Sequence, residues 1–275
     1  MNQTLSDNYI HGDNLLIAYL DLCGTKLIYS KCNLQQQIDR ILKVMNNVIE
    51  NVLNTFDDES KSIFLHMYAD SVVIAERPNS TLEDCADKFL NLLIKLQYEI
   101  LMDSESSEIY QKDFNANPNR KSLYMPVLSR ALIKRGRYYG LIIDKTKMDN
   151  LFSNFSLVGG PAIVEMDKTL QGLPMGTYID ASIIDEFQIE KDRLLDVAGH
   201  PLKFVKPLHD FNTRHSIFSP DINNRPENLD DWGKRLIEST GNDIDFKSKL
   251  IPWIDVIQRR RQIIAKRAKK QRGND

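Results

Sequence analysis

Residues 15–21, LLIAYLD, and residues 63–75, IFLHMYADSVVIA, decide the fold of this chain. Each is an apolar, β-rich run in which an acid, Asp21 or Asp70, stands where a buried strand prefers an apolar side chain. A buried carboxylate without a partner is costly, so a sequence tolerates one chiefly where a cation, an arginine or hydrogen-bond donors compensate it. The two runs therefore predict strands that each carry a compensated acid.

The surrounding sequence predicts the order β-α-β-β-α-β. A strand over 14–21 is followed by Asn33, a helix N-cap, and by apolar residues at helical spacing from Leu34 to Leu53. Asp70 falls near the turn between two β-rich runs, a capping-box pattern at 80–83 opens a second helix, and residues 127–134 form a further strand. This is the ferredoxin-like arrangement of an α+β protein with helices on the sheet.

That order brings the two acids together. The first and third strands of such a sheet are neighbours, so the end of one lies beside the start of the other. Asp21 and Asp70 are then expected to meet at one edge of the sheet. Carboxylates suit Mg²⁺ or Mn²⁺, and Mg²⁺ is usually held by one or two carboxylates together with substrate phosphates. The first hypothesis is a divalent-metal site for phosphate chemistry, and the alternative for either acid is an ion pair with a local arginine.

Four segments resemble the catalytic domain of the class III nucleotidyl cyclases, over roughly residues 14–206. The first is Leu20–Gly24 (LDLCG), and the second is Tyr68–Val73 (YADSVV). The third is Arg130–Gly136 (RALIKRG), and the fourth is residues 159–162 (GGPA), which open a helix that ends near Gly172. Each segment alone is weak evidence, but their order and spacing are those of the family.

The resemblance implies a site that is shared between the two chains of a homodimer and binds a nucleoside triphosphate. Asp21 and Asp70, with the backbone of Leu22, would hold two Mg²⁺ or Mn²⁺ ions. Successive amides form an anion nest, so a second group of residues is expected to cradle the phosphates: Leu22, Cys23, Gly24 and Thr25. Positive charge for the transition state is expected from Lys168 and Lys206, with Arg130 and Arg135 as further candidates.

The base pocket departs from that of adenylate and guanylate cyclases. His66 stands where adenylate cyclases carry a base-reading lysine, and Val164 and Lys168 stand where an Asn and an Arg are usual. The acid for the purine edge would fall near Leu157. The sequence therefore most resembles the pyrimidine cyclases of Pycsar antiphage defence, which implies conversion of UTP or CTP to the 3′,5′-cyclic monophosphate as a messenger for an effector protein. His66 as an ordinary sheet residue and Lys168 as a solvated lysine are the alternatives.

Two rival functions belong to other classes. Residues 20–25, LDLCGT, also resemble the Asp-x-Asp-Gly-Thr start of haloacid-dehalogenase phosphatases, but Cys23 replaces the second aspartate, the acid/base of that family. The other rival is a cyclase-like sheet that binds a nucleotide or a partner without catalysis, which agrees with the missing Asn and Arg.

The composition of the chain limits the classes of protein to which it can belong. The chain has 275 residues, 42% of them hydrophobic, and a net charge of −2, which fits a full core and does not indicate bulk nucleic-acid binding. Its three cysteines lack metal-ligand spacing and suit a reducing compartment, and Cys23 is interpreted as a small loop residue. No apolar run reaches the roughly 18 residues that span a bilayer, and the start lacks a signal-peptide pattern, so a cytoplasmic protein is expected.

Two regions lie outside the resemblance. Residues 103–122 are polar and predict a loop inserted in a catalytic domain of residues 1–208. Residues 209–275 predict a helical extension in which Trp232 and Trp253 dock on the core. Its basic end, residues 259–272, fits a solvated tail or, alternatively, contact with nucleic acid or an anionic surface.

Overall fold

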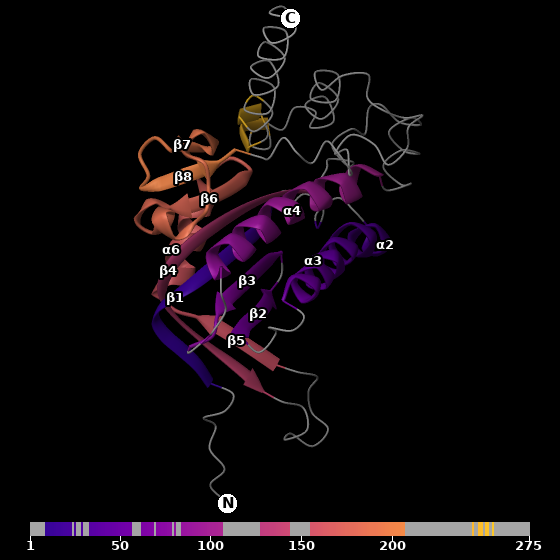
Figure 1. Cartoon of the computed structure of the whole chain (residues 1–275). Coiled ribbons are helices and arrows are strands. Elements are labelled where there is room, and N and C mark those ends of the chain that lie inside the picture. The colour runs from indigo at the N-terminus through magenta and orange to yellow at the C-terminus, as the bar shows by residue number, and fades with distance from the viewer. Residues whose placement is uncertain are drawn as a thin grey trace, which may run out of the picture.

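The structure is a computed structural model (Figure 1). It describes residues 9–23, 25, 29, 33–56, 62–68, 70–78, 80, 84–106, 127–143, 155–206, 244, 247–249, 251, 252 and 255.

The predicted β-α-β-β-α-β order is confirmed. Its elements are β1 (Tyr9–Cys23), α2 (Leu34–Gln37), a π-helical segment η2 (Ile38–Leu42), α3 (Lys43–Thr55), β2 (Ile63–Tyr68), β3 (Ser71–Glu76), α4 (Cys85–Ser106) and β4 (Leu128–Ile143). Residues 103–106 were predicted to be loop, but they form the end of helix α4. The helix continues past its last apolar residues into the polar segment. The rest of the predicted loop up to residue 122 lies outside the described residues.

The second half of the domain adds a helix and short strands. They are β5 (Phe155–Gly159), α6 (Pro161–Gln171), β6 (Gly176–Asp180), η6 (Ala181–Glu186), η7 (Lys191–Arg193), β7 (Leu194–Asp196) and β8 (Leu202–Val205). The described strands form one sheet in the order β2-β3-β1-β4-β6-β8-β7, and β5 pairs with β4. The β4–β6 pair is parallel, whereas the other pairs are antiparallel.

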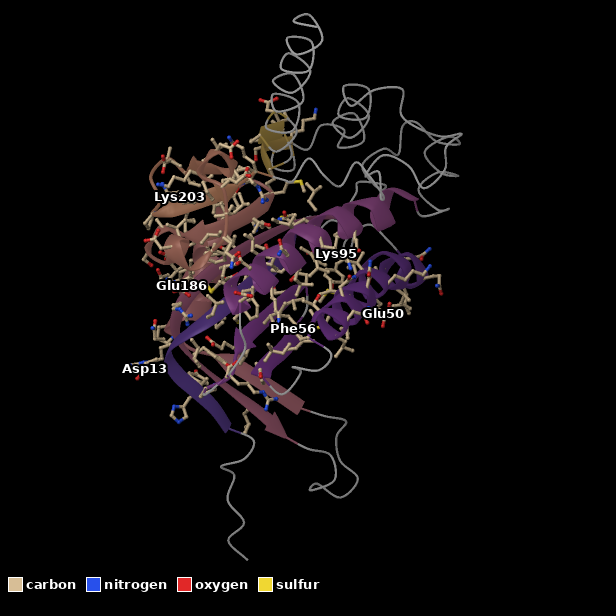
Figure 2. The ribbon with its side chains drawn as sticks, in the orientation of Figure 1. Asp13, Glu50, Phe56, Lys95, Glu186 and Lys203 are labelled. Atoms are coloured by element: carbon tan, nitrogen blue, oxygen red, sulfur yellow. The ribbon has the colours of Figure 1, made fainter. Side chains whose placement is uncertain are left out.

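Helices cover both faces of the sheet. Helix α4 contacts one face, where Gln97 accepts a hydrogen bond from Thr177 Oγ1 at 2.9 Å, and α3 packs on α4 through the edge-to-face pair Phe56–Phe89 with ring centroids 5.6 Å apart (Figure 2). Helix α6 lies on the opposite face. A Cβ at Gly136 of β4 would stand 2.6 Å from Ala162 Cβ, so glycine permits this close approach.

The extension contributes a few described residues. Among them, Lys249 places its carbonyl oxygen 2.9 Å from the backbone N–H of Met175, in the loop between α6 and β6. Residues 209–243, Trp253 and the basic end at 259–272 lie outside the described residues. Within the described part of the chain, no helix is both long enough and apolar enough to cross a membrane.

Candidate active site

Asp21 and Asp70 lie beside each other, as the sequence predicted. Strands β1 and β3 pair with Asp21 opposite Ser71, and Asp70 occupies the turn that precedes Ser71. The backbone N–H of Leu22 donates to the carbonyl oxygen of Asp70 at 2.9 Å, which fixes the turn against the end of β1. The adjacency therefore follows from strand pairing.

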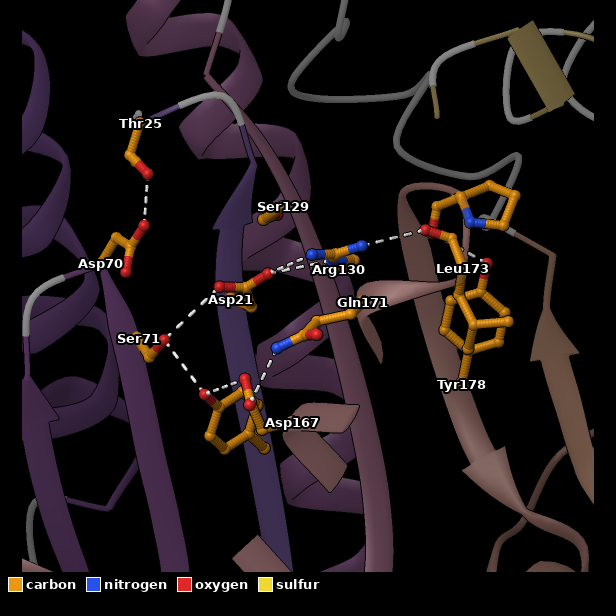
Figure 3. A network of polar contacts seen from close by, with 12 residues as sticks. Asp21, Thr25, Asp70, Ser71, Ser129, Arg130, Asp167, Gln171, Leu173 and Tyr178 are labelled. Atoms are coloured by element: carbon orange, nitrogen blue, oxygen red, sulfur yellow. Dashed lines mark hydrogen bonds and ion pairs between the residues drawn. The ribbon is translucent and has the colours of Figure 1, made fainter. Parts of the chain in front are cut away.

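Asp21 is held by a buried arginine. Arg130 of β4 is its cross-strand neighbour, and the Nε and Nη2 atoms of Arg130 donate to Asp21 Oδ2 at 2.9 and 2.7 Å (Figure 3). The two side chains are 8% and 15% exposed, so solvent screens this pair weakly. An arginine partner for the acid is thus present, although it lies 109 positions away and is not a local residue.

Burial raises the pKa of Asp21 above its usual range, and Arg130 acts against this by its charge and its hydrogen bonds. The carboxylates of Asp70 and Asp167 lie near enough to raise the same pKa further. Three carboxylates and the guanidinium of Arg130 therefore form one group of charges around Asp21. When all are ionised this group carries two more negative than positive charges, a balance that a divalent cation would neutralise.

Asp70 accepts a hydrogen bond at Oδ2 from the hydroxyl of Thr25, which is itself buried (Figure 3). Thr25 therefore joins the predicted loop to the second acid. The amide of Leu22 is already bonded to Asp70, so it is not part of the predicted anion nest in this arrangement. Gly24 lies outside the described residues.

Cys23 is buried at the end of β1, and burial raises the pKa of its thiol to about 12. The side chain is therefore a neutral thiol at neutral pH. A proton-transfer role requires a pKa near the working pH. Cys23 was predicted to be a small residue of the phosphate loop, and the structure places it as the last residue of β1.

The two candidate arginines lie on opposite faces of the sheet. Arg130 reaches the site, and its Nη1 also donates to the carbonyl oxygen of Leu173 at 3.3 Å, in the loop after α6. Arg135 pairs with Leu16, five positions back along β1, so alternation turns its side chain to the other face. There it binds Glu76 and Glu186 at 3.2 and 2.8 Å. Arg135 therefore does not contact Asp21 or Asp70 of its own chain.

The structure adds a polar network that the sequence did not reveal. Tyr19, two residues before Asp21, points its hydroxyl toward Asp167 of α6 and toward Ser71 (Figure 3). Ser71 donates to Asp21 Oδ1 at 3.4 Å, and Gln171 donates to the second oxygen of Asp167 at 3.0 Å. Tyr19 and Asp167 are 148 positions apart, so no local pattern signals their contact.

His66, Lys168 and Lys206, the remaining predicted residues, lie on three different elements. His66 on β2 is buried and stacks on Phe64, with ring centroids 6.4 Å apart, and burial lowers its pKa. Lys168 is exposed in the last turn of α6. Lys206 follows β8, three strand spacings from Asp21, or about 14 Å at roughly 4.8 Å each, and its ammonium donates to the carbonyl oxygen of Asp192.

The donor set fits a divalent cation that also needs ligands from a substrate. No group of three or more His, Cys, Asp or Glu side chains in the described ranges is arranged to hold a metal. The two neighbouring carboxylates of Asp21 and Asp70 would hold such an ion together with phosphate oxygens, as is common for Mg²⁺. The excess negative charge at this point agrees with that assignment.

No protein-family model matches the sequence, and no curated protein is similar to it in sequence. The fold, however, is similar to the non-canonical dimeric guanylyl cyclase domain of the RhoGC fusion protein from the aquatic fungus Blastocladiella emersonii. The TM-score is 0.50 and the identity is 9%, over 72% of this chain and 96% of that chain. The adenylyl cyclase CyaB from P. aeruginosa is also similar, with a TM-score of 0.47 and 11% identity over 74% of this chain and 98% of the other. The α+β fold predicted from the sequence, that of a cyclase catalytic domain, is confirmed by the first likeness.

Proposed function

We propose that this protein is a metal-dependent nucleotide cyclase that converts UTP or CTP to its 3′,5′-cyclic monophosphate and pyrophosphate. The observation that carries the proposal is the pair Asp21 and Asp70. Asp21 lies near the end of β1, and Asp70 lies beside it in the turn before β3, where negative charge is in excess. The fold alone supports many functions, so this site is the argument.

The reaction joins the ribose 3′-oxygen to the α-phosphorus and breaks the bond from that phosphorus to the bridging oxygen, while the hydroxyl proton is released. Mg²⁺ or Mn²⁺, two ions per site, would neutralise the attacking and leaving oxygens and orient the triphosphate. Asp21 and Asp70 would hold the ions. Arg130 would keep Asp21 in place and bring a fixed positive charge near the phosphates.

The base preference rests on His66 and on the absence of purine-reading residues. The lowered pKa of His66 keeps its imidazole neutral at neutral pH, so the ring offers one donor and one acceptor. Such a pair of groups can recognise a pyrimidine edge. We favour UTP over CTP, as the commoner substrate among the pyrimidine cyclases that the sequence resembles.

The complete enzyme in this proposal is a homodimer. Asp167 contacts its own sheet whereas Lys168 is exposed, and in this proposal Lys168 would reach the site of a second chain. The product would be a messenger for a separate effector in antiviral defence, made in the cytoplasm.

A phosphatase function finds no support in the site. Cys23 would have to act as acid/base in place of an aspartate, and its raised pKa of about 12 prevents that at neutral pH. A cyclase-like protein without catalysis is the remaining rival, and activity decides between the two.

The experiment is incubation of the full chain with each of the four nucleoside triphosphates and Mn²⁺, followed by chromatographic separation of the products. We expect cyclic UMP or cyclic CMP with pyrophosphate from the wild type, and no cyclic product from Asp21→Asn or Asp70→Asn. Free phosphate alone would indicate a phosphatase, and unchanged substrates would indicate a binding protein. Cyclic AMP formed in preference to the pyrimidine products would refute the pyrimidine assignment but still support a nucleotide cyclase.

A further inference from the structure

Helix α6 and the loop that follows it reach both oxygens of Asp21. Asp21 Oδ2 is bound by Arg130, and Arg130 Nη1 in turn donates to Leu173 O in the loop after α6. Asp21 Oδ1 accepts from Ser71 at 3.4 Å, and Ser71 lies 3.2 Å from the hydroxyl of Tyr19. Tyr19 closes the path to α6 by donating to Asp167 Oδ1 at 3.2 Å (Figure 3).

The single proton of Tyr19 decides how this network is arranged. The distances from its oxygen to Asp167 Oδ1 and to Ser71 Oγ are both 3.2 Å, so the two acceptors compete. A carboxylate is the stronger acceptor, and the proton therefore goes to Asp167. Ser71 also has a single proton, which it gives to Asp21, so no proton lies between Tyr19 and Ser71 while Tyr19 donates to Asp167. Without Asp167, Tyr19 would donate to Ser71, and this new bond would shift the Ser71 hydroxyl relative to Asp21.

Asp167 is itself held in one orientation. Gln171, one turn further along α6, donates to Asp167 Oδ2 at 3.0 Å, which leaves Oδ1 facing Tyr19. Tyr19 is 1% exposed, so its hydroxyl depends on these protein partners. Gln171 is exposed, Asp167 is half-buried, and Tyr19 and Ser71 are buried, so the polar contacts lead from the surface of α6 to a proposed metal ligand.

We propose that Asp167 is a positioning residue, which holds the Asp21 carboxylate in its metal-binding orientation through Tyr19 and Ser71. This inference rests on the proposed function, because it takes Asp21 to be a metal ligand. Partners that orient a metal ligand typically contribute about 10-fold to 100-fold in metal affinity. We expect Asp167→Ala to lie at the lower end of that range, since two hydroxyls separate it from Asp21.

The test is a titration of the full chain with Mn²⁺ alone, followed by electron paramagnetic resonance, with thermal unfolding as the check on folding. Asp167→Ala and Tyr19→Phe are each expected to raise the Kd for Mn²⁺ about 10-fold. Their combination is expected to bind no more weakly than either alone, because both cut the same path. Asp167→Asn keeps the acceptor oxygen and should lie closer to the wild type than Asp167→Ala.

Glu165→Gln is the matched control, since Glu165 lies on the same helix but bonds to Lys134 at 2.8 Å. It removes one negative charge and is expected to leave the Kd unchanged. A wild-type Kd in folded Asp167→Ala overturns the inference, as do equal losses in Asp167→Asn and Asp167→Ala, or additive losses in the double variant. If Asp167→Ala and Asp21→Ala both bind Mn²⁺ with the wild-type Kd, the metal site of the proposed function is refuted as well. If only Asp21→Ala binds more weakly, the metal site stands and only the role of Asp167 is refuted.

Discussion

At the scale of single residues, the ion pair of Asp21 and Arg130 predicts how the two side chains depend on each other. Arg130 is buried, and Asp21→Ala removes the carboxylate that its Nε and Nη2 atoms contact. Asp21→Ala is therefore expected to lower the free energy of unfolding by about 3 kcal/mol. Arg130→Met in the same chain removes the buried charge, and the double variant should recover part of this loss in urea unfolding. A double variant less stable than Asp21→Ala would show that Arg130 is stabilised by other contacts.

His66 predicts a dependence of stability on pH. Burial lowers the pKa of His66 in the folded chain below the value of about 6.5 for an exposed histidine. As pH falls through that value the unfolded chain gains a proton that folded His66 resists, so the free energy of unfolding falls. The loss ends once the pH is below the folded pKa.

Urea unfolding at pH 7.5 and pH 5.5 checks this expectation. The difference between the two pH values should be smaller in His66→Gln than in the wild type. His200→Gln, at an exposed position, is the control and should keep the wild-type difference. An equal difference in wild type and His66→Gln would mean that other groups set the pH dependence.

At the scale of elements, Gly160 fixes where α6 begins. Its φ is +125°, a conformation that side chains rarely adopt, and a Cβ there would lie 2.8 Å from Arg137 O and 2.9 Å from Tyr138 Cα. Gly160→Ala is expected to lower the free energy of unfolding by about 2 kcal/mol and to weaken Mn²⁺ binding, because α6 carries Asp167. Gly172 follows the end of the same helix, and a Cβ there would meet nothing within 4 Å, so Gly172→Ala should be neutral in both measurements.

The elements also show how far the sequence alone could predict this molecule. Strand and helix order followed from local hydrophobic spacing, and the meeting of Asp21 and Asp70 followed from that order. The Arg130 pairing depends on the β1–β4 register, and the Asp167 contact depends on how α6 packs over the sheet. Neither leaves a local signal. Local pattern likewise failed to predict the short strands β5 to β8.

At the scale of the whole molecule, the extension is attached to the loop that helps to hold Arg130. Met175 donates to Lys249 O, and two positions earlier Leu173 O accepts from Arg130. The described residue Lys249 thus contacts the loop that lies next to the site.

The last prediction concerns the assembly and follows from the opposite directions of two adjacent residues. Asp167 faces its own sheet, whereas Lys168 is exposed. In the proposed dimer, Asp167 would act on Asp21 of its own chain and Lys168 on the substrate of the neighbouring chain. Asp70→Ala and Lys168→Ala chains are each expected to be inactive, since one lacks a metal ligand and the other the cation for the phosphates. Mixed together, they should regain cyclase activity, because a heterodimer then contains one site with Asp21, Asp70 and Lys168 intact.

Complementation is measured as cyclic nucleotide formed, after subunit exchange has been shown with two affinity tags. Lys191→Ala, a change at another exposed lysine, should be active alone and serves as the control. Full activity of Lys168→Ala alone would make Lys168 a surface residue and leave Arg130 and Lys206 as the cations to test. If both variants are inactive, exchange subunits and still form no product, all the catalytic groups lie within one chain. A site built across the interface would be intact at one of the two sites of every heterodimer, and product would form.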